Sequence, residues 1–317
     1  MDRSVVMATK IRAAFAPCSL GDWPTPLEAQ PGLAHAVGLD ALWLKREDLA
    51  GGNKVRGLEF LFAGVPARSV FVTIGGTGSS HCLTTARFAR AQGHRTAVAL
   101  FDQPATDASR RIAVATVATA DVVVRAHNPL TLPWAVLRAW RAARRLGPRT
   151  PHWIPGGGAE PRAVIGHFLA TLELELQVDA PPDAIIVPLG TGGTAAGIAL
   201  GVAWLGWPTQ VVAMRVAPRI VANSWRTMRL ARHAAALLRR AGVGFDVPRS
   251  SLRVRIVNAM GPGYGYPTPD GERARTLAAE HGLQLDPTYG AKAFSFFLRQ
   301  STGKVKRGVF WQTFPSS

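Results

Sequence analysis

The chain has 317 residues, 47% of them apolar, which indicates a folded protein with one large domain or two smaller ones and excludes extended disorder. Its longest nearly uncharged apolar stretch, residues 195–207, is too short to cross a bilayer. Lys10 and Arg12 interrupt any apolar leader near the start of the chain. We therefore expect a cytoplasmic protein with no membrane partner.

The formal net charge of +17 would ordinarily suggest nucleic-acid binding. The charge comes from 31 Arg and only six Lys, and the arginines are scattered over segments with helical periodicity. The densest groups, residues 138–149 and 226–240, place arginines among apolar residues at helical spacing, which predicts solvated helix faces. We expect no nucleic-acid partner; a binding protein for an acidic partner is the alternative.

The chain contains two cysteines, Cys18 and Cys82, which we expect to be reduced thiols because a large α/β protein needs no disulfide. A catalytic thiol at Cys82 is an alternative, with the adjacent His81 as the only obvious base.

Residues 1–38 are predicted to be irregular, and short β-rich runs then alternate with helical segments. In the first half we expect strands at 41–46, 70–74, 95–101 and 121–124, and helices from Lys54 and at 80–92, 108–118 and 132–146. Trp134, Leu137 and Trp140 are predicted to face inward from the last of these helices.

Beyond a break at residues 151–161 the alternation resumes. There we expect helices at 161–177, 194–205, 220–241, 270–281 and 290–300, and strands at 184–189, 210–216, 253–258 and 308–313. The alternation is typical of parallel βαβ units and predicts an α/β fold. We expect a larger domain formed by residues 1–57 plus 150–317 and a smaller α/β domain formed by residues 58–149.

The main chemical signal is a lysine that follows a tight glycine turn. Gly51-Gly52 allows a reversal between the strand 41–46 and a helix that Asn53 is predicted to cap and Lys54 to open. Ligands of open α/β sheets bind at such strand-to-helix corners. A helix N-terminus also disfavours a charged amine, so the neutral form that attacks carbonyl groups is favoured. The alternative is an ordinary surface lysine.

Two glycine-rich turns follow predicted strands. In the second, Gly190, Thr191, Gly192, Gly193 and Thr194 combine convergent N–H groups, hydroxyls and a helix N-terminus, which suits a phosphate. Its spacing matches neither a Walker A loop nor a dinucleotide fingerprint. A glycine turn without a ligand is the alternative.

The first glycine-rich turn, residues 73–81, ends in Ser79, Ser80 and His81 at a predicted helix start. Donors at such a position can bind a substrate carboxylate. The alternative is a pair of capping serines beside a partly buried histidine.

All three tyrosines of the chain, Tyr264, Tyr266 and Tyr289, fall in the segments 261–267 and 285–293. A phenol near a cation can act as an acid or a base, so we expect at least two of them at a site. Turn-flanking aromatic residues are the alternative.

The segment Lys45-Arg46-Glu47-Asp48-Leu49, followed by Gly51-Gly52-Asn53-Lys54-Val55-Arg56, resembles the cofactor-lysine segment of the 1-aminocyclopropane-1-carboxylate deaminase / D-cysteine desulfhydrase family. The glycine turns, the tyrosine segments and the last strand resemble that family in the same order, from about Trp23 to Thr313. The resemblance implies two domains with parallel-rich open twisted sheets of the tryptophan-synthase-β type (PLP fold type II), and pyridoxal 5′-phosphate as cofactor. We also expect a homodimer and no metal.

The resemblance also implies roles for individual residues. Lys54 bonds the cofactor covalently and returns as the proton-transfer base, while Ser79 holds the substrate carboxylate and Tyr264 and Tyr289 flank the reacting carbons. The remaining cofactor contacts fall to Asn53, Ser80, His81, Gly190, Thr191, Gly192, Gly193, Thr194 and, at the pyridine nitrogen, Thr313.

Three features depart from the family pattern: Ser80 stands where Asn is common, Phe314-Pro315 replaces two glycines, and the loop before Gly51 is short. We expect a deaminase or β-lyase that converts a small amino acid, similar to D-cysteine or to 1-aminocyclopropane-1-carboxylate, into ammonia and a 2-oxo acid. Elimination ranks above ring opening. The alternatives are a specialised biosynthetic enzyme acting on a non-standard amino acid and a catalytically impaired homologue.

Overall fold

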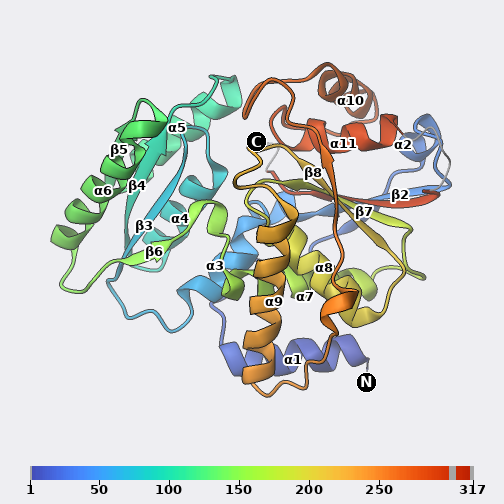
Figure 1. Ribbon diagram of the computed structural model, residues 1–317, viewed down its shortest axis with the longest axis horizontal. Coiled ribbons are helices and arrows are strands. Elements are labelled where there is room, and N and C mark those ends of the chain that lie inside the picture. The colour runs from blue at the N-terminus through green and yellow to red at the C-terminus, as the bar shows by residue number, and fades with distance from the viewer. Residues whose placement is uncertain (1, 300–304, 315–317) are drawn as a thin grey trace. The chain divides into compact units, whose positions relative to one another are not determined.

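The computed structural model describes residues 2–299 and 305–314. The chain divides into two compact units, Met1–Phe60 with Pro161–Ser317, and Leu61–Glu160. Each unit is built on its own sheet, with helices and strands alternating along the chain (Figure 1). The predicted α/β class with parallel-rich sheets is confirmed.

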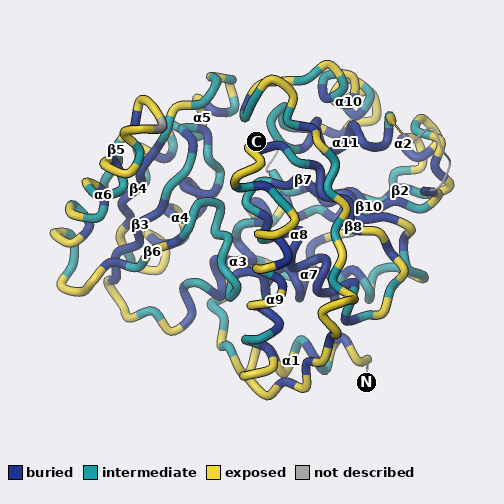
Figure 2. Tube along the Cα trace, in the orientation of Figure 1, coloured by how far each residue is buried: buried dark blue, intermediate teal, exposed yellow. Residues whose placement is uncertain are grey.

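The larger unit contains a six-stranded sheet. Its strands run in the order β1 (Leu27–Ala29), β2 (Ala41–Arg46), β10 (Arg307–Gln312), β7 (Ala184–Leu189), β8 (Gln210–Arg215) and β9 (Arg255–Asn258). Among these described strands β1 and β2 pair antiparallel, and the other neighbours pair parallel. Strand β7 is buried along its whole length, as a central parallel strand covered on both faces should be (Figure 2). The parallel strands therefore end at one edge of the sheet.

Helices cover both faces of this sheet. They are α1 (Arg3–Phe15), α2 (Pro31–Ala36), α3 (Lys54–Phe62), α7 (Pro161–Glu175), α8 (Gly193–Leu205), α9 (Ser224–Arg240), α10 (Pro269–Glu280) and α11 (Gly290–Leu298). Ile186 and Phe310 point into a core with α2, α10 and α11, whereas Ile185 and Val309 point into a core with α7 and α8. The alternation of side chains along the strands thus fills two cores.

Small residues bring α3, α7 and α8 close together. A side chain at Gly166 of α7 would collide with the backbone of Arg56 in α3, and one at Gly197 of α8 would collide with His167 of α7. Gly57 similarly faces Ala163. The start of α3 is therefore packed tightly onto α7.

The smaller unit has a parallel sheet in the order β5 (Val122–Ala126), β4 (Arg95–Phe101), β3 (Val70–Gly76) and β6 (His152–Ile154). Helix α6 (Leu132–Leu146) covers one face through Ala135, Ala139 and Ala143. Helix α4 (Ser80–Ala91) covers the other face, and α5 (Asp107–Thr119) packs beside α4. Short 3-10 turns, η1 (Glu47–Ala50), η2 (Pro129–Thr131), η3 (Gly156–Gly158) and η4 (Arg249–Ser251), complete the elements of the described chain.

Two expectations about local structure were wrong, and one strand was missed. Residues 1–38 are not irregular: α1 forms there, begins at a cap in which the Asp2 side chain accepts from Ser4 N, and packs Met7 and Ile11 into a core. Strand β6, three residues long, gave no sequence signal. Trp134 is 67% exposed rather than inward, because the alanines of α6 form its buried stripe.

The unit boundaries also differ from the expected ones. Because β6 pairs with β3, residues 150–160 belong to the smaller unit. Among the described residues, no helix is long and apolar enough to cross a membrane.

Candidate functional site

Lys54 lies at the predicted corner. After β2 and η1, Gly51 and Gly52 adopt φ angles of +81° and +96°, and α3 begins at Lys54. Burial lowers the pKa of Lys54 from 10.5 to about 8. Its amine forms no hydrogen bond to any residue that the structure describes. A substantial share of the amine is therefore neutral near pH 8 and competent to attack a carbonyl.

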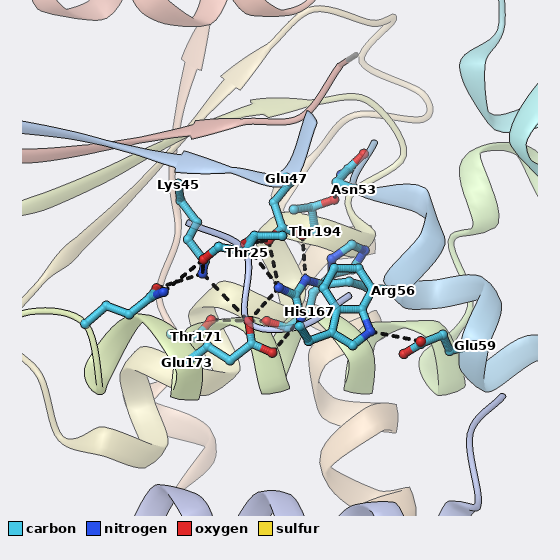
Figure 3. Close-up of polar contacts among 12 residues, drawn as sticks. Thr25, Lys45, Glu47, Asn53, Arg56, Glu59, His167, Thr171, Glu173 and Thr194 are labelled. Atoms are coloured by element: carbon cyan, nitrogen blue, oxygen red, sulfur yellow. Dashed lines mark hydrogen bonds and ion pairs between the residues drawn. The ribbon is translucent and has the colours of Figure 1, made fainter. Parts of the chain in front are cut away.

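Asn53 connects this corner to two other strand ends. Its Nδ2 donates to Thr194 Oγ1 at 2.7 Å (Figure 3), and its backbone N donates to the Thr313 carbonyl at 3.1 Å. Thr194 lies in the first turn of α8 after β7, and Thr313 directly follows β10. Lys54, the second glycine turn and the end of the last strand therefore meet at one edge of the larger sheet.

The glycine turn after β7 forms a cradle. The buried strand gives way to the partly exposed residues Gly190, Thr191 and Gly193. Gly192, the N-cap residue of α8, has a φ of +96°, and no side chain of the described chain caps the helix. A Cβ at Gly192 would lie 2.8 Å from Thr227 Oγ1. The unpaired N–H groups and the positive end of α8 are thus open to an anion such as a phosphate.

The two tyrosine segments meet at the same turn. Tyr264 and Tyr289 place their hydroxyl oxygens 2.5 Å apart, with ring planes at 78°. A Cβ at Gly190 would lie 3.7 Å from the Tyr289 ring, and Phe314 stacks on that ring with a 14° interplanar angle. Phe314, a departure from the family pattern, thus contributes an aromatic wall; Pro315 lies outside the described residues. Tyr266 is 51% exposed.

In the smaller unit, the predicted serines and histidine lie at the start of α4. Ser79 is the N-cap residue and Ser80 the first residue of the helix. His81 is buried, with Nε2 2.8 Å from Thr73 Oγ1 and Nδ1 3.5 Å from Thr85 Oγ1. Contact of these three residues with cofactor or substrate remains a prediction.

The structure does not favour Cys82 as a catalytic thiol. Cys82 is buried, and desolvation raises the pKa of its thiol from 9.0 to about 12, so the nucleophilic thiolate is scarce at neutral pH. Cys82 and Cys18 are both free cysteines.

A buried ionic network behind Lys54 was not predicted. The guanidinium of Arg56, two residues after Lys54, pairs with Glu47 (2.5 and 2.9 Å) and with Glu173 (2.6 and 2.9 Å) (Figure 3). It also lies 3.8 Å from the Trp23 ring centroid. Burial opposes the charge, but the two carboxylates outweigh it and raise the Arg56 pKa. The network joins η1, α3 and α7, and so fixes the backbone on either side of Lys54.

Lys45 and Lys292 have partners that Lys54 lacks. Lys45 Nζ donates to the Thr25 carbonyl at 2.7 Å and to Gln177 Oε1 at 2.8 Å, and Lys292 Nζ donates to the Met260 carbonyl at 2.8 Å. Both side chains are fully buried. Of the remaining lysines, Lys10 and Lys306 are exposed, and Lys304 lies outside the described residues. The geometry therefore favours Lys54 as the reactive amine.

His167 of α7 is a second residue that sequence reasoning missed. It is buried, and its Nδ1 has no hydrogen-bond partner among the described residues. Burial, with added repulsion from Lys54 and Arg56, holds its pKa well below 6.5. The imidazole is therefore neutral and adds no positive charge beside Lys54.

Comparison with known proteins gives the family. Residues 18–311 match the family described as pyridoxal-phosphate dependent enzyme. Nocardicin C-9′ epimerase of Nocardia uniformis subsp. tsuyamanensis is 34% identical over 302 residues, covering 92% of this chain and 90% of the relative. The mitochondrial bifunctional D-cysteine desulfhydrase/1-aminocyclopropane-1-carboxylate deaminase of Arabidopsis thaliana is 31% identical over 312 residues, covering 91% and 74%. D-cysteine desulfhydrase of Klebsiella pneumoniae is 29% identical over 294 residues, covering 89% and 87%.

Solved structures with a similar fold were also found. The crystal structure of an ACC deaminase homologue matches with a TM-score of 0.81 and 26% identity, covering 96% of this chain and 94% of that one. A threonine deaminase from T.th., at 18% identity and a TM-score of 0.71 over 98% of both chains, supports the fold alone. The predicted fold type II is confirmed. The chain belongs to the pyridoxal-phosphate dependent enzymes, and its cofactor is pyridoxal 5′-phosphate.

Proposed function

We propose that this enzyme is a lyase that deaminates a small amino acid by elimination, releasing ammonia and a 2-oxo acid. A β-substituted substrate such as D-cysteine ranks ahead of 1-aminocyclopropane-1-carboxylate. The observation that carries the proposal is the pair of bonds from Asn53 to Thr194 and Thr313, because they bring the free amine of Lys54 to the glycine cradle.

The chain's residues fit the cofactor. Lys54 would bond it, the turn from Gly190 to Thr194 would hold its phosphate, and the Thr313 hydroxyl would be the partner for its ring nitrogen. When bound, pyridoxal phosphate draws electrons away from the substrate's α-carbon. A neutral hydroxyl at the ring nitrogen would make this electron withdrawal weaker than a carboxylate partner would make it.

The proton chemistry then falls to Lys54 and the tyrosine pair. With a pKa of about 8, the Lys54 amine accepts and returns a proton near neutral pH. Tyr264 and Tyr289 share one hydrogen bond, so either phenol can pass a proton to a departing group while the other holds its oxygen in place. The Arg56 network keeps α3 from shifting during these steps.

A further part of this proposal concerns the residues at the start of α4. Ser79 holds the substrate carboxylate, and Ser80 and His81 contact the cofactor. Ser80 is shorter than the Asn common in the family, so a contact between Ser80 and the ring hydroxyl of the bound cofactor would need a bridging water. A Ser80→Asn variant is the matched test, and we expect it to bind the cofactor at least as tightly as the natural chain.

The test is to offer D-cysteine, L-cysteine, β-chloro-D-alanine and 1-aminocyclopropane-1-carboxylate to the holoenzyme, with Lys54→Ala as the inactive control. Ammonia, sulfide, pyruvate and 2-oxobutyrate are measured. We expect pyruvate and ammonia from a β-substituted substrate. If 2-oxobutyrate forms from the cyclopropane substrate faster than pyruvate forms from the β-substituted substrates, the order of the two substrate classes is reversed. If none of the four compounds gives a product, the proposal is contradicted.

Epimerisation at the α-carbon is a second candidate, favoured by the 34% identity to an enzyme named as an epimerase. It would need Lys54 to remove the same proton and a second group to return a proton to the opposite face, a role we assign to one of the two tyrosines. Solvent deuterium distinguishes the two reactions. Incorporation at the α-carbon with inversion and without ammonia indicates epimerisation, whereas ammonia release indicates elimination.

We also propose that the enzyme acts on a small free amino acid, as a cytoplasmic homodimer without a nucleic-acid or membrane partner. The free thiols of Cys18 and Cys82 support a reducing compartment. Light scattering tests the dimer, and fractionation of cells that express the chain tests the location. A monomer at micromolar concentration would refute the dimer.

A further inference from the structure

A fully buried lysine links the two segments that carry Tyr264 and Tyr289. Lys292 lies on α11, three residues after Tyr289. Its Nζ donates to the carbonyl oxygens of Met260 (2.8 Å) and Gly263 (3.4 Å). Both acceptors lie on the segment that leads to Tyr264, so one amine joins the α11 side of the pair to the loop side.

The Tyr289 side has its own anchor. The Asp286 carboxylate accepts hydrogen bonds from the backbone N–H groups of Thr288 (3.0 Å), Tyr289 (2.7 Å) and Gly290 (2.7 Å). Desolvation raises the pKa of Asp286 and lowers that of Lys292 to about 8, and in each case the charge of the other residue partly offsets the effect. The charges of Asp286 and Lys292 therefore stabilise each other at the start of α11.

Space filling alone does not explain Lys292. Its neighbours on α11, Ala291, Ala293 and Phe294, are buried and apolar, so a methionine or leucine would fill the position without the cost of desolvating an amine. Tyr264, in contrast, lies on a segment without helix or strand. A hydroxyl pair held at 2.5 Å requires such a segment to be fixed, and the two carbonyl bonds to Lys292 fix it.

We propose that Lys292 is a positioning residue that sets the Tyr264–Tyr289 contact. It holds the 260–263 backbone against α11, so that the Tyr264 hydroxyl reaches that of Tyr289. The catalytic consequence rests on the proposed function, in which this pair moves a proton at the reacting carbons. The effect of Lys292 on the distance between the Tyr264 and Tyr289 hydroxyls does not depend on the proposed function.

The test compares Lys292→Met with Lys45→Met, a matched control at a lysine of the same unit. Lys45 is equally buried, its pKa is likewise lowered to about 8, and its amine also donates to a backbone carbonyl. It contacts Thr25, Gln177 and Glu173 rather than a tyrosine segment. Both variants lose a buried amine, so general destabilisation is common to them.

The first readout is the NMR spectrum of apo-protein labelled at tyrosine Cζ, which gives three signals because the chain has three tyrosines. We expect Lys292→Met to shift the Tyr264 and Tyr289 signals, and Lys45→Met to shift neither of them. Unchanged signals in folded Lys292→Met, or the same shifts in both variants, would overturn the proposal. If Lys292→Met does not fold, Lys292→Arg replaces it in the comparison. The larger guanidinium must displace the 260–263 backbone, so an unchanged Tyr264 signal in Lys292→Arg would refute the proposal.

The second readout is kinetic. We expect Lys292→Met to lower kcat by about 10- to 100-fold, with KM and cofactor affinity unchanged, because a misplaced proton donor slows chemistry and not binding. An unchanged kcat would overturn the catalytic consequence. If the natural enzyme turns over none of the offered substrates, the proposed function fails, and the NMR comparison still tests the geometry.

Discussion

Replacing Gly192 by alanine tests the phosphate cradle. An L-residue held at a φ near +96° costs about 1–2 kcal/mol relative to glycine. Its Cβ would also lie 2.8 Å from Thr227 Oγ1, closer than side chains tolerate, so the turn has to move. Gly206, at the other end of α8, has a φ of +71° and no described atom within 4 Å of an added Cβ. Gly206→Ala therefore carries the backbone strain without the collision.

We expect Gly192→Ala to weaken pyridoxal 5′-phosphate binding at least tenfold, a loss of about 1.4 kcal/mol, and Gly206→Ala to leave it unchanged. Gly206→Ala should lose about 1–2 kcal/mol of unfolding free energy, and Gly192→Ala should lose at least as much. Cofactor titration of the apo-proteins by absorbance, with urea denaturation in parallel, measures the two quantities. Pyridoxal, which lacks the phosphate, should bind Gly192→Ala and the natural chain equally. Unchanged phosphate-ester affinity in folded Gly192→Ala, or an equal loss for pyridoxal, would refute the assignment.

Three further predictions concern the residues around the cradle. The rate at which apo-protein captures the cofactor should rise with pH and level off above about 8, because the neutral amine of Lys54 then predominates; a stopped-flow rate that is flat from pH 6 to 9 contradicts this. Arg56→Met should lower the free energy of unfolding by about 3–5 kcal/mol in urea denaturation, because Glu47 and Glu173 lose their buried cation, and a loss below about 1 kcal/mol would show that the network is not stabilising. Tyr264→Phe keeps the ring but removes the hydroxyl, so kcat should fall while the absorbance of the bound cofactor is unchanged, and full activity would exclude Tyr264 from proton transfer.

The local parts of the site could be predicted from the sequence. Gly51-Gly52 before Lys54 and the glycine turn at 190–193 are short patterns whose backbone requirements are visible in the residues themselves. All three tyrosines of the chain fall in two segments that were expected at the site, but the 2.5 Å contact between the hydroxyls of Tyr264 and Tyr289 required the structure.

Residues that reach the site from distant parts of the sequence could not be identified from a short sequence pattern. Glu173 lies 117 residues from Arg56, and nothing in its helix marks it as the second carboxylate of the network. His167 and Lys292 sit in helices whose apolar periodicity predicts core positions, so their polar atoms could be assigned only from packing. Trp134 was misplaced for the opposite reason: its hydrophobicity suggested burial, whereas small alanines fit closer to the sheet.

The most direct test of the account is to identify the lysine that carries the cofactor. Holoenzyme is reduced with borohydride and digested, and the pyridoxyl group is located by mass spectrometry. We predict the modification on Lys54 alone, and we predict that Lys54→Ala, with an unchanged circular dichroism spectrum, retains no reducible absorbance. Modification of Lys45 or Lys292, or a reducible adduct that persists in Lys54→Ala, would contradict it.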